Sequence, residues 1–554
     1  MKPYILHRSY LLSLISGLLA GIAWPGITPL FFLIFFAFVP MLFMEDKLLE
    51  EKGTARKIFF RAFLGFLLWN IISTYFIFCI RDPYAESAAM ELLSKTVASG
   101  LTYVLNASFM AIVFWLFHLT RKHLGDRAGY TGLVAYWMSF EYLHMHWSIN
   151  WPWLNLGNVF AEHITWVQWY SITGSPGGSL WVILVNIAIF IALKKTLNNS
   201  EDSKTVWIKP ALIVLIPFIC SLIIYSSYEE KGEEVEMVLL QPNLDPYEEK
   251  FDSDPLQQLR RMLALADSAD TPETRWYILP ETALIEHTLV YGEPGRPDFS
   301  GLWEHDYDAA ISTTMIRDFL APRDAVLLAG AADRSYSKEK KSTSSRYIEP
   351  LQIYYESYNT TLLIDQEGVE ENYHKSKLVP GVESIPFTAF MGFLGDLALD
   401  LGGASGSLGV QDSVEIFPFD GHALAPTICY ESVFGEYTSL FVKKGANCIA
   451  ISTNDSWWQD SPGYVQLLAY SRLRAIECRR DIARAANTGI TCFIDQKGNI
   501  TSQLPWWEEG ALRGSVKMNN ELTFYVQYGD FLSRVAAMIS CLLLLWAFTR
   551  RLKS

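Results

Sequence analysis

Residues 422–445, HALAPTICYESVFGEYTSLFVKKG, pass from an apolar run through a cysteine into a pattern typical of a helix. The run LAPTI predicts a buried strand, and the segment that begins at Glu431 predicts a helix. Cys429 falls at the turn between them, where backbone N–H groups and the positive end of a helix favour a thiolate. The alternative reading of a lone cysteine, an inert buried thiol, stays open at this point.

Strand and helix patterns alternate on both sides of this segment. Runs typical of strands include EVEMVLLQPN, RWYILPE, AVLLAGA, TTLLIDQEG, CIAISTND and ITCFIDQKGNI. Helical patterns lie between them, over residues 254–269 and 464–487. Alternation on this scale is typical of an α/β sheet domain, which we place at residues 229–525.

Apolar segments flank the α/β region, and most of them approach the roughly 20 residues that cross a bilayer core. The first resembles a signal peptide, but it lacks an A-x-A site and runs into the second, which favours a retained helix. The sequence therefore predicts a membrane α-helical bundle of about eight transmembrane helices, seven within residues 1–228 and one within residues 526–554. The segments lie at roughly residues 9–24, 28–44, 58–80, 98–119, 129–149, 176–193, 209–226 and 531–549.

Lys and Arg residues gather in alternate short loops and in the C-terminal tail, as at Arg121, Lys122 and Arg550. Because such loops face the cytoplasm, the pattern places the α/β region on the other side of the membrane. The outer loop at residues 147–157, WSINWPWLNLG, is either an aromatic belt or the lining of a lipid portal. The run FTAFMGF at residues 387–393 either forms a lid or packs on the sheet.

Composition excludes some classes of function. A net charge of −14 argues against a nucleic-acid binder, which needs a basic face. The seven cysteines show no close pairing, and the ten histidines form no HExxH pattern. Neither a metal nor another cofactor is expected.

Three residues supply the parts of an activated cysteine site. Glu281 ends the strand pattern WYILPE, Lys375 lies in YHKSKLVPGVE, and Cys429 lies in PTICYE. A carboxylate can take the thiol proton, and an ammonium can stabilise an oxyanion. Taken singly, Glu281 could be a helix N-cap and Lys375 a solvated surface lysine.

The order Glu, Lys, Cys, each after a strand, resembles the catalytic triad of the nitrilase superfamily, as do NDSWW at residues 454–458 and the segments at 472–491 and 494–500. The resemblance implies an αββα sandwich. With apolar helices on both sides, the chain resembles the bacterial apolipoprotein N-acyltransferase family over nearly its whole length. WPWLNLG resembles a further motif of that family.

The same resemblance assigns accessory residues for catalysis or substrate binding. The motif register favours Lys375 over Lys377 as the triad lysine and makes Glu383 the accessory glutamate. Cys-Tyr-Glu of the family falls on Cys429, Tyr430 and Glu431. The chain departs from the family at three positions: Phe251 stands where a tryptophan is frequent, and Ser456 and Gln459 stand where glycines are usual.

The resemblance implies an acyltransferase of the bacterial inner membrane whose catalytic domain faces the periplasm. Its partners would be a phospholipid acyl donor, a diacylglyceryl-apolipoprotein acceptor and the bilayer, with no metal and no nucleic acid. A membrane-anchored amidase for small amides is the alternative within enzymes. A non-catalytic membrane channel or scaffold is the alternative of another class; few intramembrane charges disfavour it, with Glu141 the main exception.

Overall fold

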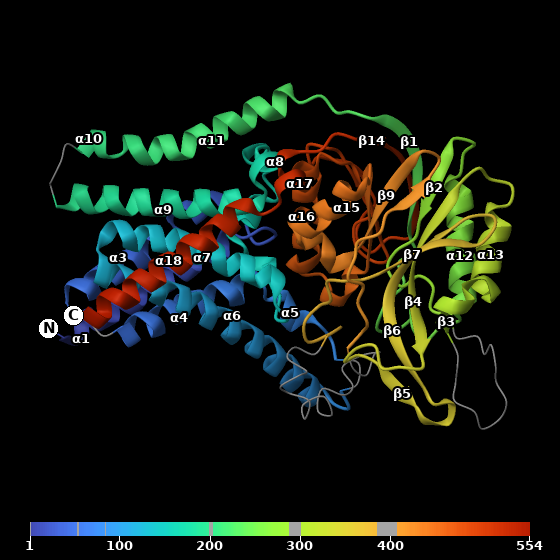
Figure 1. The fold of residues 1–554 in the computed structure, drawn as a ribbon, viewed down its shortest axis with the longest axis horizontal. Coiled ribbons are helices and arrows are strands. Elements are labelled where there is room, and N and C mark those ends of the chain that lie inside the picture. The colour runs from blue at the N-terminus through green and yellow to red at the C-terminus, as the bar shows by residue number, and fades with distance from the viewer. Residues whose placement is uncertain are drawn as a thin grey trace.

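The structure, a computed structural model, describes residues 2–51, 55–82, 85–198, 203–286, 301–384 and 407–553. Figure 1 shows a bundle of long helices, near whose outer end both chain termini lie, beside an α/β part built on strands. The predicted lid segment at residues 387–393 falls outside the described residues.

The sequence predicts about eight membrane spans, and the structure supports part of this prediction. Among the described residues, four helices are long and apolar enough to cross a membrane: Ala88–Leu124, Ser175–Leu197, Lys204–Ser227 and Phe531–Arg550. A shorter apolar helix covers Ser9–Ile22. The chain is therefore a membrane protein with a helical N-terminal region. The long helices are α1 (Lys2–Ile22), α3 (Val39–Glu50), α4 (Ala55–Ser73), α6 (Ala88–Leu124), α7 (Asp126–His146), α9 (Ser175–Leu197), α11 (Ile208–Ser227) and α18 (Phe531–Lys553).

Two predicted apolar segments are not single helices. Segment 28–44 begins with η1 (Phe31–Leu33) and α2 (Ile34–Ala37) before α3 starts at Val39. Pro40 lies in the first turn of α3, where its missing N–H costs nothing, so it starts a new helix rather than continuing the previous one. Segment 58–80 divides into α4 and the short α5 (Phe76–Cys79).

The α/β part contains two sheets. The first has the order β14-β1-β2-β4-β6-β5, with β3 paired to β4 and β7 to β6, and the second has the order β13-β12-β11-β10-β9-β8. The strands of the first sheet are β1 (Glu233–Gln241), β2 (Thr274–Ile278), β3 (Leu302–Trp303), β4 (Val326–Ser337), β5 (Arg346–Ile348), β6 (Ile353–Ile364), β7 (Val369–His374) and β14 (Gly510–Met518). Those of the second are β8 (Phe417–Phe419), β9 (His422–Ile428), β10 (Cys448–Thr453), β11 (Ile482–Ala486), β12 (Cys492–Ile494) and β13 (Ile500–Gln503).

Helices cover the outer face of each sheet. In Figure 1, α12 (Pro255–Ala269) and α13 (Ile311–Leu320) lie outside the first sheet, and α15 (Gly435–Lys444) and α16 (Pro462–Cys478) lie between the second sheet and the bundle. The predicted helix at 254–269 forms because Asp254 caps it, accepting from Leu256 N at 2.9 Å, with Pro255 at its start. The arrangement is the αββα sandwich that the resemblance implies.

The predicted helix over residues 464–487 is wrong beyond Cys478. α16 ends at Cys478, and Arg479 follows in a left-handed conformation with φ 49°. Residues Ile482–Ala486 then form β11, a buried strand between β10 and β12. Burial in the middle of the sheet overrides the helical propensity of the alanines.

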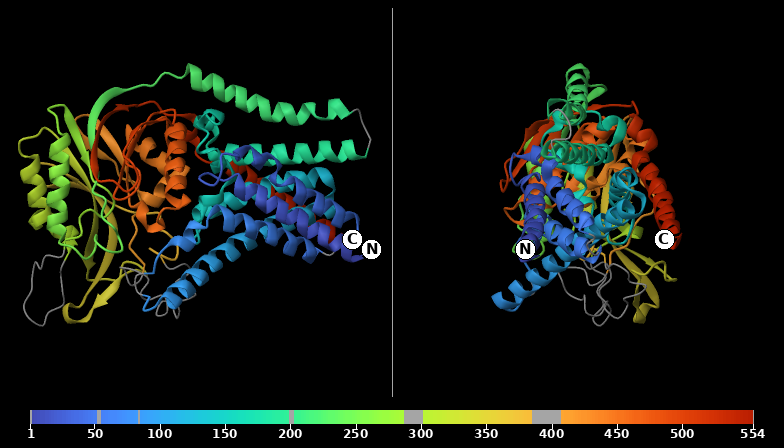
Figure 2. Two further views of the ribbon diagram at one scale, coloured as in Figure 1. Left: turned by 180° about the vertical axis from the view of Figure 1, so that it is seen from behind. Right: turned by 90° about the vertical axis from the view of Figure 1, so that its left-hand side faces the viewer.

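α16 joins the α/β part to the bundle. Gln466, which is fully buried, donates to the carbonyls of Pro25 and Ser73 at 2.9 Å each. Tyr470 donates to the carbonyl of Trp153 at 2.9 Å and accepts from the Trp24 indole at 3.0 Å. The left view of Figure 2 shows this helical layer between the bundle and the sheets. One hydrophobic core runs through both parts.

Candidate active site

The three predicted triad residues each follow the carboxyl end of a strand. Glu281 comes after β2, Lys375 directly after β7, and Cys429 directly after β9. All three side chains are buried, and Lys375 is only 1% exposed. The two sheets meet at this edge, where Ser452 at the end of β10 donates to the carbonyl of Leu279 at 3.0 Å. The structure thus brings Glu281 and Cys429, which are 148 positions apart in the sequence, to the same edge of the sheets.

Lys375 binds two carboxylates. Its Nζ lies 3.2 Å from Glu281 Oε1 and 2.7 Å from Glu383 Oε1. Asn359, on β6, donates its side-chain amide to the same two oxygens, at 2.7 Å for Glu281 and 3.3 Å for Glu383. Lys375 and Asn359 therefore fix the orientation of Glu281, and Glu383 joins the cluster as the resemblance implies.

The charges on these groups follow from their neighbours. Burial alone would lower the pKa of Lys375, but Glu281, Glu383 and Cys429 together raise it well above its usual value. These neighbours therefore favour the charged form of Lys375. Burial raises the pKa of the Cys429 thiol, Glu281 raises it further, and Lys375 and a hydrogen bond with Thr453 offset this only in part. The resting thiol is protonated and needs a base before it can attack.

Cys429 lies on a strained backbone. Its φ is 47°, a left-handed conformation that is uncommon for a residue with a side chain. A short helical turn, η7 (Cys429–Val433), follows, and α15 begins two residues later. The predicted helix therefore starts later than Glu431, and the cysteine stands at a sharp strand-to-helix turn. Strain of this kind is concentrated at functional sites.

Glu431 links the turn that holds Cys429 to the segment that follows Lys375. Its Oε1 accepts from the Tyr373 hydroxyl and the Ser376 backbone N–H, both at 2.7 Å, and from the Lys377 N–H at 3.2 Å. Its Oε2 accepts from the Ile428 N–H at 2.9 Å. Glu431 is fully buried and holds the segments before Cys429 and after Lys375 at a fixed separation.

Tyr430 connects the site to the membrane part. Its hydroxyl donates to the carbonyl of Asn150 at 3.1 Å, and its ring stacks on Trp153 with centroids 6.3 Å apart. Both partners belong to the tryptophan-rich loop at residues 147–157. Trp151 stacks on Trp153 in turn, at 5.7 Å. The residue next to Cys429 is therefore packed against the helical region.

Phe251, the remaining predicted site residue, lies in the loop before α12. Its side chain is 45% exposed, and its ring stacks on Trp457 at 6.2 Å. It makes an aromatic surface together with Tyr247, whose ring meets Trp457 edge-on at 5.3 Å. Of the other departures from the family, Gln459 has a φ of 56°, a conformation that glycine adopts easily.

Sequence patterns missed Asn359, Lys250 and Thr453. Asn359 directly precedes the strand pattern TTLLIDQEG, and nothing in its neighbourhood marks it as a ligand of Glu281. Lys250 lies in the polar run PYEEKFDSD, which suggests exposure, yet it is 2% exposed and contacts the Glu281 turn. Thr453 is held by Asp455, which in turn is paired with the buried Arg484 at 2.8 Å.

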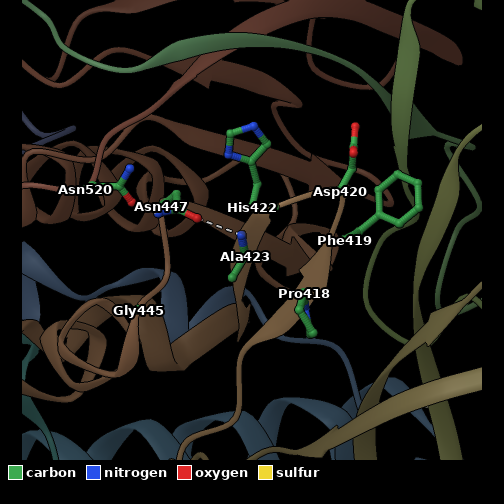
Figure 3. Close-up of a pocket in the computed structure, with 9 residues that line it drawn as sticks. Pro418, Phe419, Asp420, His422, Ala423, Gly445, Asn447 and Asn520 are labelled. Atoms are coloured by element: carbon green, nitrogen blue, oxygen red, sulfur yellow. Dashed lines mark hydrogen bonds between the residues drawn. The ribbon is translucent and has the colours of Figure 1, made fainter.

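Within the described part of the chain, no group of three or more His, Cys, Asp or Glu side chains is placed to hold a metal ion. A pocket at the β8–β9 hairpin, lined by Asp420 and His422 among others, contains none of the predicted site residues (Figure 3). Its Asn447 is already engaged, accepting from Ala423 N at 2.7 Å and donating to Asn520.

Comparison with known proteins gives the same division of the chain. Residues 16–188 match the apolipoprotein N-acyltransferase N-terminal domain, and residues 240–521 match the carbon-nitrogen hydrolase family. The apolipoprotein N-acyltransferase of Chlorobaculum tepidum is 27% identical over 565 residues, covering 99% of this chain and 98% of its own. That of Geobacter metallireducens is 24% identical, covering 98% and 96%, and that of Nitrosomonas europaea is 29% identical, covering 81% of each chain.

A solved structure, Saccharomyces cerevisiae Nit3 of the nitrilase superfamily, aligns with 52% of this chain and 92% of its own at 13% identity and a TM-score of 0.35. The two family matches, in this order, coincide with the helical bundle and with the two-sheet sandwich that holds the Glu281–Lys375–Cys429 cluster. The chain belongs to the apolipoprotein N-acyltransferase family, and its α/β part is a carbon-nitrogen hydrolase domain.

Proposed function

We propose that this enzyme transfers an acyl chain from a phospholipid, through a thioester on Cys429, to the α-amine of the N-terminal diacylglyceryl-cysteine of apolipoproteins. The observation that carries the proposal is the convergence of Glu281 and Lys375 at the turn that holds a buried thiol, in a site packed against membrane helices. Similarity to apolipoprotein N-acyltransferases over nearly the whole chain supports it.

In the first step Glu281 acts as the general base. It takes the proton of the Cys429 thiol, and the thiolate attacks the ester carbonyl of the phospholipid. Lys375 and the backbone N–H of Tyr430 stabilise the oxyanion, because both donors are held in place before the reaction begins. The tetrahedral intermediate then collapses, and the lysophospholipid leaves with the proton returned by Glu281.

In the second step the acyl chain passes to an amine. The neutral α-amine of the diacylglyceryl-cysteine attacks the thioester carbonyl, and the same donors hold the new oxyanion. Glu281 takes a proton from the nitrogen as the amide forms, and Cys429 leaves as the thiol once that proton reaches it. Over the two steps an ester bond breaks and an amide bond forms, and Glu281 and Cys429 return to their starting protonation states without a cofactor.

The accessory residues have separate roles in this scheme. Glu383 accepts from Lys375 and, through its other oxygen, from the Val379 N–H at 2.8 Å, so it fixes the turn that carries the lysine. Glu431 sets the position of the Cys429 turn, and Tyr430 provides both the oxyanion donor and the contact with the membrane part. The exposed Phe251 ring lies beside Trp457 as an apolar surface for substrate chains.

Both substrates are lipids, which explains the membrane part. Burying an acyl chain in the bilayer is favourable by about 0.8 kcal/mol per CH₂, so neither substrate leaves the membrane to reach a soluble enzyme. The stack of Trp151, Trp153 and Tyr430 supports a site at the membrane surface with an apolar approach from the side. This favours the lipid portal over a simple aromatic belt for the loop at 147–157.

We place the catalytic domain, residues 229–525, in the periplasm, between seven spans within residues 1–228 and one within residues 526–554. The inner membrane of a bacterium with an outer membrane is the corresponding location. The positive charges at Arg121, Lys122 and Arg550 support this orientation, because basic loops stay in the cytoplasm.

The test is incubation of the purified enzyme with phospholipid and a diacylated lipopeptide, followed by mass spectrometry of the lipopeptide. Wild type is expected to produce a triacylated lipopeptide, and Cys429→Ala to produce none. Turnover of a small amide without acylation of the lipopeptide would replace the proposal with an amidase. Normal complementation of a depleted strain by Cys429→Ala would instead support a channel or scaffold.

A further inference from the structure

Lys250 is a buried lysine beside the active site to which no step of the reaction assigns a role. It lies in the loop between β1 and α12, and its side chain is 2% exposed. Its backbone is held at both ends: the N–H donates to the carbonyl of Asp245 at 2.8 Å, and the carbonyl accepts from Gln258 Nε2 at 2.8 Å. The side chain is therefore directed inward from a fixed loop.

The ammonium of Lys250 binds the turn that carries Glu281. Its Nζ donates to the Glu281 carbonyl at 2.8 Å and to the Thr282 hydroxyl at 2.7 Å. The Phe251 ring lies 5.8 Å from Nζ and adds a cation–π contact. The lysine contacts the backbone of the proposed general base, while Lys375 and Asn359 hold its carboxylate from the other side.

The turn at Thr282 is strained. The φ of this residue is 48°, a conformation that is a genuine outlier for a β-branched residue, so other contacts must hold it. The neighbouring strand β4 approaches the turn closely at Gly330. A Cβ added there would lie 2.4 Å from the Pro280 carbonyl oxygen and 2.7 Å from the Glu281 Cα. The turn thus lies between the β4 backbone and the Lys250 ammonium and contacts both.

Burying a charged group costs free energy unless the group forms hydrogen bonds or an ion pair. Burial lowers the pKa of Lys250 to about 8, and the Glu281 carboxylate limits the decrease. A methionine would fill the same space without the cost of burying a charge. The ammonium has a function that methionine cannot provide, because an apolar side chain cannot donate hydrogen bonds to a carbonyl and a hydroxyl.

We propose that Lys250 is a positioning residue for Glu281: it fixes the left-handed turn at Thr282, and this turn directs the Glu281 carboxylate toward Lys375 and Cys429. The inference rests on the proposed function, since it gives Glu281 the role of general base. Displacing a catalytic group by about 1 Å can cost as much as 100-fold in rate, so a residue that acts only on the turn can control the chemistry.

The test measures the rate constant for acylation of Cys429 by phospholipid, per titrated active site, in full-length enzyme. Lys250→Met is expected to lower this rate constant about tenfold or more, with the donor concentration for half-maximal rate within about twofold of wild type. Thr282→Val removes the acceptor hydroxyl but keeps the lysine and the β-branched shape, and it should cause a smaller loss. Because the two changes remove one shared contact, the double variant should be no slower than Lys250→Met alone.

Lys231→Met, which removes an exposed lysine paired with Glu521, is the matched control and should acylate at the wild-type rate. An unchanged rate constant per site in Lys250→Met, or losses that multiply in the double variant, would overturn the role of Lys250 while leaving the proposed function intact. If Lys250→Met does not fold, Thr282→Val decides alone, and a wild-type rate there overturns the inference. Failure of wild type itself to form an acyl adduct would overturn the proposed function and this inference with it.

Discussion

At the scale of single residues, Lys375 and Cys429 are held in different charge states although both are buried. Lys375 is locked as a cation by two carboxylates, whereas Cys429 is kept as a thiol by burial. A protonated thiol is a weaker nucleophile than a thiolate, and in the proposed mechanism Cys429 attacks once Glu281 has taken its proton.

A buried carboxyl elsewhere in the domain gives a prediction on pH. Burial raises the pKa of Asp481 from 3.8 to about 7, and only one of its carboxyl oxygens has a partner among the described residues, the Lys517 N–H at 2.7 Å. The folded-state pKa lies above the unfolded one, so the contribution to stability is complete below the unfolded pKa and is lost as the pH rises through about 7.

Asp481→Asn cannot ionise and should not share this loss. Relative to wild type, its melting temperature in detergent should increase by a few degrees between about pH 5 and about pH 8. Asp324→Asn, which neutralises an exposed carboxylate, is the control and should show no such trend. A constant difference between Asp481→Asn and wild type over this range would show that burial does not raise the folded-state pKa of Asp481, because the carboxyl would then be ionised in both states.

At the scale of elements, the site depends on strand ends being held in register. β7 and β9 belong to different sheets, and Glu431 is the side chain that links the residues after β7 to the turn after β9. Its two oxygens accept four hydrogen bonds, three of them from backbone N–H groups, and that of Ile428 is buried. An acceptor-only group is needed here because every partner is a donor.

Glu431→Gln should therefore destabilise both turns. In either amide orientation an NH₂ group faces an N–H donor, which leaves buried donors unpaired at a cost of about 1–3 kcal/mol each. We expect a lower melting temperature and acylation at least about tenfold slower, whereas Tyr373→Phe, which removes one neutral donor, should cause a smaller loss. Wild-type stability and activity in Glu431→Gln would refute the linking role.

Local patterns predicted those parts of the fold that local chemistry decides. The strand LAPTI, the helix at 254–269 and the positions of Glu281, Lys375 and Cys429 after strands all follow from periodicity and turn residues, and the structure confirms these placements. β11 could not be predicted, because IARAA becomes a strand only when the sheet buries it. Asn359 and Lys250 were missed because each acts across a long sequence distance. Gln459, which the motif comparison marked, does have a glycine-like φ of 56°.

At the scale of the whole molecule, the bundle and the catalytic domain form one packed body. Gln466 and Tyr470 of α16 bind residues from the bundle, and the hydrophobic core is continuous between the two parts. α6 has 37 residues, so it is about 55 Å long, well beyond the roughly 30 Å of a bilayer core. Its first turns therefore extend toward the catalytic domain, as Figure 2 shows.

The proposed orientation can be tested by labelling intact cells with a membrane-impermeant maleimide. In a background with Cys79, Cys220 and Cys541 replaced by serine, Glu339→Cys in the catalytic domain should be labelled. Lys122→Cys, at the opposite end of α6, should be labelled only after the cells are opened. Labelling of Lys122→Cys in intact cells, with Glu339→Cys protected, would reverse the orientation.

The most direct test of the central claim is the mass of the peptide that contains Cys429. Full-length enzyme is incubated with a phospholipid of one defined acyl chain and no acceptor, quenched with acid and digested. The account predicts one acyl chain on Cys429, removed by hydroxylamine, absent from Cys429→Ala and formed much more slowly in Glu281→Gln. An acyl chain on another residue, or none on Cys429 while lipopeptide is still acylated in the complete reaction, would contradict it.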